Sequence, residues 1–127
     1  MRGQGLRSWI AKFGHALRGC RFAVASQGSF WVHLPMAVAV LVLGPLLGVS
    51  LLAYCILILC VAVVIMAELL NTAIEILAAR LHPQHDEAIG RALDVAAAAV
   101  LVVAVGAAFV GVIILGGAAW QQLAGEL

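Results

Sequence analysis

The sequence predicts an all-α membrane protein in which an amphipathic surface helix precedes three membrane-spanning helices. Of its 127 residues, 65% are hydrophobic and 10% are charged, whereas soluble domains are about 45–50% apolar and about 25% charged. The excess of apolar side chains must face lipid. A helix of about 20 residues crosses the ~30 Å hydrocarbon core, and the uncharged runs provide enough length for three crossings. We therefore expect one membrane domain, residues 1–127.

Residues 1–28 are predicted to form a helix that lies in the membrane interface. Apolar residues recur there at spacings of three or four, while basic residues lie largely elsewhere on the helix, which is typical of an interfacial helix whose basic face meets anionic headgroups. A generic surface anchor and a substrate-binding helix fit this pattern equally well. The apolar positions are Leu6, Trp9, Ile10, Phe13, Leu17 and Cys20, and the basic positions are Arg7, Lys12, Arg18 and Arg21.

Three spans are predicted from the uncharged runs that follow. No charged residue occurs from Leu34 to Ala67, and this run is too long for one crossing, so the chain must turn back within it. The segment Gly-Pro-Leu-Leu-Gly-Val-Ser at 44–50 marks the turn, because proline removes a backbone donor and glycine and serine favour turns. The predicted spans cover about 31–47, 51–78 and 92–121.

The distribution of basic residues predicts the orientation in the membrane. Five lysines and arginines precede the first span, Arg80 and Arg91 flank the loop between the second and third spans, and none follows Arg91. By the positive-inside rule, the N-terminus and that loop are cytoplasmic, and the C-terminus lies on the outer side. The net charge of +1 gives no reason to expect a nucleic acid partner.

A stripe of polar residues ends the second span. Glu68, Asn71, Thr72 and Glu75 fall at i, i+3, i+4 and i+7, which is one face of a helix. An acid at mid-span costs about 2.5–3.5 kcal/mol on insertion scales, so these side chains need buried partners. Asp94 begins the third span at the same predicted depth and is followed by small residues that allow close helix packing.

Carboxylate and amide oxygens at one level are the ligands that Mg²⁺ prefers, usually together with substrate phosphates. An ion pathway would also use intramembrane acids, but residues 95–121 contain no ionisable group, which disfavours transport. A third interpretation is that the acids only join helices through hydrogen bonds. The cytoplasm-facing cluster favours an interfacial enzyme that takes one substrate from the cytosol and one from the bilayer.

At these residues the sequence resembles the bacterial integral-membrane diacylglycerol kinase family, which includes undecaprenol kinases. The resemblance rests on Glu-Leu-Leu-Asn-Thr-Ala-Ile-Glu at 68–75 and Ala-Leu-Asp-Val-Ala-Ala-Ala-Ala-Val at 92–100. The order of these blocks, the span count, the basic N-terminus and Phe-Trp-Val-His at 30–33 agree as well. The resemblance covers nearly the whole chain, and the first block is the more specific.

The resemblance implies a homotrimer in the bacterial cytoplasmic membrane that transfers the γ-phosphoryl group of ATP, with Mg²⁺ as cofactor, to a membrane lipid alcohol. The expected product is phosphatidic acid from diacylglycerol. The alternatives are an undecaprenol kinase, or a degenerate member that binds lipid or nucleotide without turnover.

The resemblance also implies roles for individual residues, with active sites shared between neighbouring subunits. Glu68 would be the general base, and Glu75 and Gln27 would bind the metal. The lipid substrate would contact Glu68, Arg18, Arg21, Ser29 and Phe30, and the nucleotide would contact Asn71, Glu75, Asp94 and Gln27. As our own hypothesis beyond the resemblance, His15, His85 and Arg91 are further candidate nucleotide contacts.

Three positions depart from the family pattern, and each departure weakens nucleotide or metal binding. Leu93 stands where the family has a lysine, Gln27 where it has a metal-binding glutamate, and Ala79 where it usually has an aspartate. Arg91, Arg80 and the histidines at 15, 82 and 85 are candidate replacement donors. His33, at the start of the first span, is expected to cap the helix or to contact headgroups.

Overall fold

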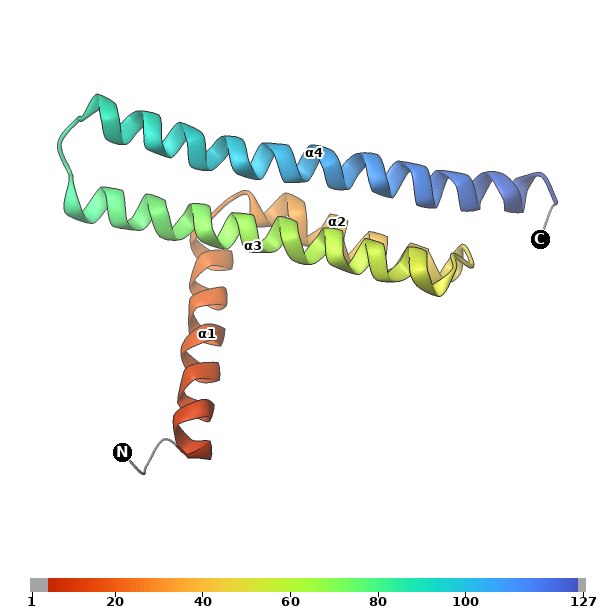
Figure 1. The fold of residues 1–127 in the computed structure, drawn as a ribbon, viewed down its shortest axis with the longest axis horizontal. Coiled ribbons are helices and arrows are strands. Elements are labelled where there is room, and N and C mark those ends of the chain that lie inside the picture. Colours follow the sequence, from red (N-terminus) through yellow and green to blue (C-terminus); the bar gives the residue numbers. More distant parts are fainter. Residues whose placement is uncertain (1–4, 126–127) are drawn as a thin grey trace.

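The computed structural model describes residues 5–125 and is entirely helical there, which confirms the predicted all-α class. Helices α2, α3 and α4 lie roughly along one direction, while α1 projects from them as a separate arm (Figure 1). Residues 1–4 of the predicted surface helix lie outside the described part. The helices are α1 (Leu6–Ser26), α2 (Phe30–Leu46), α3 (Leu51–Leu81) and α4 (Glu87–Leu123).

The chain turns sharply between α1 and α2. The two helices are bent by 113° across the three residues 27–29. Gln27 ends α1 in an extended conformation, with φ −115° and ψ 122°. Of the α1 side chains only Ala23 is buried, so the apolar stripe that includes Trp9 and Phe13 is exposed and has no partner on another helix among residues 5–125.

Helices α2 and α3 form a tight hairpin. Helix α2 continues through Pro45, and the turn is completed by Gly48, whose φ of +68° lies in the left-handed region that glycine adopts readily. The hydroxyl of Ser50 accepts a 3.2 Å hydrogen bond from the amide of Ala53 and so caps α3. Gly44 is buried, and a Cβ there would lie 2.8 Å from the ring of Tyr54.

Helices α3 and α4 are antiparallel neighbours and make the largest helix contact in the molecule. Asp86 caps α4, because its side chain accepts hydrogen bonds from the amides of Ala88 and Ile89 at 2.8 and 3.2 Å. A groove of about 440 Å³ runs between α2, α3 and α4 and is lined mainly by apolar side chains, with small residues such as Ala104 and Ala108 on the α4 side.

Few side chains are buried in the single chain. The buried apolar residues of the described part are Ala23, Phe30, Leu57 and Val64, and α4 buries none. Large apolar side chains are exposed on every helix, which agrees with a protein whose solvent is lipid.

Two helices, α3 with 31 residues and α4 with 37, are long and apolar enough to cross a membrane. Helix α2 has 17 residues and meets the same test only when it is joined to α1 across the bend, which gives a third crossing. The described part of the chain thus contains two or three membrane-spanning segments.

Candidate active site

The polar stripe of α3 faces the corner between α1 and α2. Glu68 and Thr72 are 2% and 3% exposed and are the buried polar residues of the described chain. Asn71 and Glu75 are partly buried beside them. Burial of two carboxylates on one apolar helix requires partners from other elements, and residues 27–33 supply them.

Each oxygen of the Glu68 carboxylate meets a side chain from the start of α2. The hydroxyl of Ser29 donates a 2.8 Å hydrogen bond to Oε2. The Nδ1 atom of His33 lies 2.7 Å from Oε1. Ser29 and His33 are four residues apart and share one face of the helix start, so a single turn of chain holds both oxygens.

The Glu75 carboxylate, about two helical turns after Glu68 in α3, is held in a similar way. The side-chain amide of Gln27 donates a 2.9 Å hydrogen bond to its Oε2. The amide of Asn71 donates a 2.7 Å hydrogen bond to its Oε1. The carbonyl oxygen of the Asn71 side chain is buried and has no hydrogen-bond partner among residues 5–125, which leaves one acceptor free to meet a ligand.

Thr72 belongs to the stripe by position only. Its hydroxyl donates a 2.8 Å hydrogen bond to the backbone carbonyl of Glu68, one turn back in the same helix. The hydroxyl is therefore satisfied within α3 and does not bond the side chains that hold Glu68 and Glu75. We interpret Thr72 as a structural residue.

Five of the predicted nucleotide and lipid contacts lie away from this cluster in the single chain. Asp94 is exposed on α4 and makes no hydrogen bond or ion pair with any described residue, so it does not contact the acidic cluster within one subunit. The remaining four, which are exposed as well, are Arg91, His85, Arg18 and His15. The guanidinium of Arg91 lies 3.7 Å from the carboxylate of Glu87 on α4, His85 is in the α3–α4 loop, and Arg18 donates a hydrogen bond to His15 on α1.

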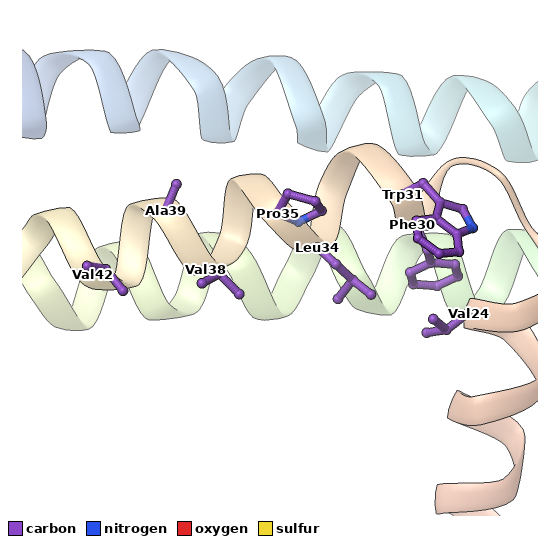
Figure 2. Close-up of a pocket in the computed structure, with 8 residues that line it drawn as sticks. All are labelled: Val24, Phe30, Trp31, Leu34, Pro35, Val38, Ala39 and Val42. Carbon is purple, nitrogen blue, oxygen red and sulfur yellow. The ribbon is translucent and has the colours of Figure 1, made fainter.

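The last two lipid candidates, Arg21 and Phe30, differ from each other in exposure. Arg21 is exposed near the end of α1. Phe30 is only 1% exposed and lines a groove of about 600 Å³ between the end of α1 and the outer face of α2. Figure 2 shows Phe30, Leu34, Val38 and Val42 following this groove along α2, with Val24 at the end of α1. Its lining is almost wholly apolar.

The oxygen ligands at Glu75 partly fit a hard divalent cation. One carboxylate, the free carbonyl oxygen of Asn71 and the amide of Gln27 lie together, and Mg²⁺ is usually held by one or two carboxylates together with waters and phosphates. Among residues 5–125 no three His, Cys, Asp or Glu side chains are arranged to hold a metal. A metal here would depend on phosphate oxygens for part of its coordination.

The comparisons with known proteins decide the family. The sequence profile of the family described as prokaryotic diacylglycerol kinase matches residues 14–115, which include the whole cluster. The chain belongs to the prokaryotic diacylglycerol kinase family. A member of this family of lipid kinases is expected in a membrane, in agreement with the apolar helices.

Two relatives of this diacylglycerol kinase family member bear different substrate names. An undecaprenol kinase of Bacillus subtilis is 34% identical over 109 residues, covering 86% of this chain and 89% of that protein. A diacylglycerol kinase of Synechocystis sp. is 35% identical over 103 residues, covering 80% of this chain. The second match spans only 59% of the length of the Synechocystis protein.

His33 is the site residue that sequence reasoning missed. Its position at the start of α2 suggested a cap or a headgroup contact, whereas the structure places its ring against Glu68. The available signal was the spacing from Ser29: residues four apart lie on one face of a helix, so whatever Ser29 meets, His33 can meet as well.

Proposed function

We propose that this protein is a Mg²⁺- and ATP-dependent lipid kinase that transfers the γ-phosphoryl group to the hydroxyl of diacylglycerol, giving phosphatidic acid. The observation that carries the proposal is the environment of Glu68. This carboxylate is 2% exposed, and its Oε2 atom already accepts a hydrogen bond from a hydroxyl, that of Ser29. The substrate alcohol would present the same group to the same oxygen.

In the proposed step, Glu68 acts as the general base for attack of the lipid hydroxyl on ATP. Oε2 of Glu68 takes the proton of the lipid hydroxyl while the hydroxyl oxygen forms a bond to the γ-phosphorus. The bond from that phosphorus to the oxygen bridging the β and γ phosphates breaks, and ADP leaves. A general base must lie within about 2.6–3.2 Å of the proton's heavy atom, and the 2.8 Å contact with Ser29 shows that a hydroxyl fits there.

Phosphoryl transfer otherwise depends mainly on positioning and on positive charge around the phosphates. Glu75, Asn71 and Gln27 are the residues that would hold Mg²⁺, which supplies neutralising charge at the β and γ phosphates. The free carbonyl oxygen of Asn71 supports this assignment. Ser29, Phe30, Arg18 and Arg21 would receive the lipid, with acyl chains along the apolar groove of α2.

A homotrimer accounts for the residues that one chain leaves scattered. Asp94, Arg91, His85 and His15 are exposed and far from being a complete nucleotide site within a single subunit. We propose that a neighbouring copy brings such side chains to the Glu75 end of the cluster. The exposed small residues of α4, which allow close helix approach, support contacts between copies.

The proposed membrane arrangement has α2, α3 and α4 as the three spans and α1 in the cytoplasmic interface. The 17 residues of α2 extend about 25 Å, slightly short of the ~30 Å hydrocarbon core. The exposed apolar face of α1 and the basic residues around it suit the headgroup region. The N-terminus and the α3–α4 loop would face the cytoplasm, and the C-terminus the outer side.

Undecaprenol is the second candidate acceptor. The match to the Bacillus subtilis undecaprenol kinase covers 89% of that protein, more than the match to the Synechocystis diacylglycerol kinase covers of its relative. An apolar groove with almost no polar lining accepts acyl and polyprenyl chains alike. The acceptor must therefore be decided by measurement.

The test is transfer of labelled phosphate from ATP to a panel of lipid alcohols in mixed micelles. Product on diacylglycerol, abolished in Glu68→Gln and retained in Glu87→Gln, is expected. Glu87 is a suitable matched control because it is also a glutamate, and its side chain is 85% exposed. Product on undecaprenol alone would select the second acceptor. No product on any acceptor, with ATP binding retained, would show a degenerate family member.

A further inference from the structure

His33 and Ser29 contact different oxygens of the Glu68 carboxylate. The Nδ1 atom of His33 lies 2.7 Å from Oε1, while Ser29 bonds Oε2. The two oxygens of one buried carboxylate are thus assigned to different partners. Ser29 is itself exposed, so an incoming hydroxyl can displace it, whereas the His33 side chain is 22% exposed.

The imidazole of His33 has no alternative partner at Nδ1. That atom is buried, and apart from the close contact with Glu68 it meets no hydrogen-bonding atom among residues 5–125. The 2.7 Å separation is a hydrogen-bonding distance, and the pair is aligned once the N–H bond points at Oε1. Because a carboxylate can only accept, the aligned pair requires the proton on Nδ1.

The surroundings of His33 exclude competing charges. His33 lines the groove between α2, α3 and α4, and the α3 and α4 side chains that line the same groove are apolar, Leu57, Val64, Ala104 and Ala107 among them. Among the described residues, Glu68 is the charged group that faces the ring. A headgroup or solvent contact at Nδ1 is therefore not available to it.

We propose that His33 is a positioning residue for the phosphoryl transfer. By holding Oε1 it fixes the plane of the carboxylate and leaves Oε2 as the oxygen that takes the proton from the lipid hydroxyl, at the place the Ser29 hydroxyl marks. His33 keeps its own Nδ1 proton throughout the step. This inference rests on the proposed function, since it assigns a partner to the proposed base.

The physical reason lies in the geometric demand of proton transfer. A carboxylate held at one oxygen alone can rotate about its last side-chain bonds, and misplacement of a catalytic group by about 1 Å can cost about 10²-fold in rate. Helix α2 begins at Phe30, so the His33 backbone is fixed by its hydrogen bond to the Ser29 carbonyl at 3.1 Å. The ring is thus anchored to the same turn that would meet the acceptor.

The kinetic test compares three substitutions at positions 33 and 121. His33→Asn places an amide nitrogen near the position of Nδ1 and keeps a donor toward Glu68, whereas His33→Leu removes it. We expect kcat to fall about 10²-fold in His33→Leu, with the KM for ATP unchanged, and to recover to within about fivefold of wild type in His33→Asn. Gln121→Leu, at an exposed residue near the end of α4 that has no assigned role, should leave both constants unchanged.

Three results would overturn the proposal: wild-type kcat in His33→Leu, equal losses in the Asn and Leu variants, or a loss confined to the KM for ATP. Should His33→Leu fail to fold in detergent, His33→Gln, whose amide nitrogen lies near the Nε2 position, replaces it as the variant without a donor at Nδ1.

A second measurement does not depend on turnover. Nitrogen NMR of ¹⁵N-histidine-labelled protein should show His33 protonated at Nδ1 in the wild type, and the Nδ1 proton should be lost in Glu68→Leu, which removes the acceptor. A His33 ring protonated only at Nε2 in the wild type would refute the contact itself. If the wild type transferred no phosphate to any lipid, the proposed function would fail, while the NMR result would still decide whether His33 holds Glu68.

Discussion

The side-chain amide of Gln27 donates a 2.9 Å hydrogen bond to Glu75, a residue 48 positions further along the chain. Family relatives are expected to have a glutamate at position 27, which would bring a second negative charge to this contact. In the present chain the neutral amide satisfies Glu75 without any metal. Metal binding should therefore contribute less to stability here than it would with two carboxylates.

The substitution Gln27→Glu tests this relationship. Two carboxylates in direct contact repel each other, so the variant should unfold at a lower temperature than wild type in EDTA and at a higher one in saturating Mg²⁺. Its half-saturating Mg²⁺ concentration should fall about tenfold, equivalent to about 1.4 kcal/mol. Thermal unfolding in detergent across a Mg²⁺ titration measures both effects. Gln27→Ala is the control, and a Mg²⁺ response equal to that of Gln27→Glu would contradict the prediction.

Leu93→Lys should improve the use of ATP. Leu93 is partly buried next to Asp94 and stands where the family pattern has a lysine, so the substitution restores a cation for phosphate charge. A hydrogen bond to a charged group contributes about 1.5–3 kcal/mol, and we expect the KM for ATP to fall roughly tenfold. Steady-state kinetics at fixed lipid concentration provides the measurement. Leu93→Met should behave as wild type, and an unchanged KM in Leu93→Lys would show that position 93 does not reach the nucleotide.

Thr72→Val should leave phosphoryl transfer intact. The Thr72 hydroxyl bonds the backbone of its own helix at 2.8 Å, and valine has a similar shape without a polar group to bury. The free energy of unfolding should change by no more than about 1 kcal/mol, and kcat should stay within about twofold of wild type. Asn71→Leu, which removes the amide that holds Glu75, is the contrasting variant and should lose activity. Loss of activity in Thr72→Val would place its hydroxyl in the site after all.

Gly44→Ala should destabilise the hairpin of α2 and α3. The added methyl group would lie 2.8 Å from the Tyr54 ring, whose hydroxyl is held by a 2.9 Å hydrogen bond to the carbonyl of Leu41. Overpacking of this kind costs about 1–3 kcal/mol. Thermal unfolding should show the loss, and Gly44→Ala combined with Tyr54→Leu should recover part of it. Gly117→Ala, where a Cβ meets nothing within 4 Å, is the matched control, and an equal loss there would refute the contact as the cause.

The fold was predictable because each level of the sequence points to it. Each feature has a local cause. The uncharged runs face lipid, the turn at 44–50 contains Gly48 at a positive φ, and the loop before α4 ends at Asp86, which caps that helix. The helical spacing of Glu68 and Glu75 likewise placed both acids on one face, and the structure puts them there.

The partners of those acids were harder to predict because they depend on the angle between two helices. Gly28 marks a break between the helices, but residues 27–29 do not specify its angle of 113°. This angle decides that Gln27 meets Glu75 and that Ser29 and His33 meet Glu68. The proposed role of Asp94 depends further on the proposed contacts between copies of the chain. Family resemblance supplied roles for several residues, but it gave none to His33.

The corner at residues 27–29 also determines how this protein can be handled. Gln27 and Ser29 hold the two carboxylates through side chains on a three-residue joint, while α1 itself buries a single residue against the rest of the chain. A detergent that lets the N-terminal arm swing would thus remove one of the two partners of each acid, Gln27 from Glu75 and Ser29 from Glu68, while every helix stayed folded. Circular dichroism would then report an intact sample that has lost its chemistry, and purification should be guided by turnover in a bilayer-like environment.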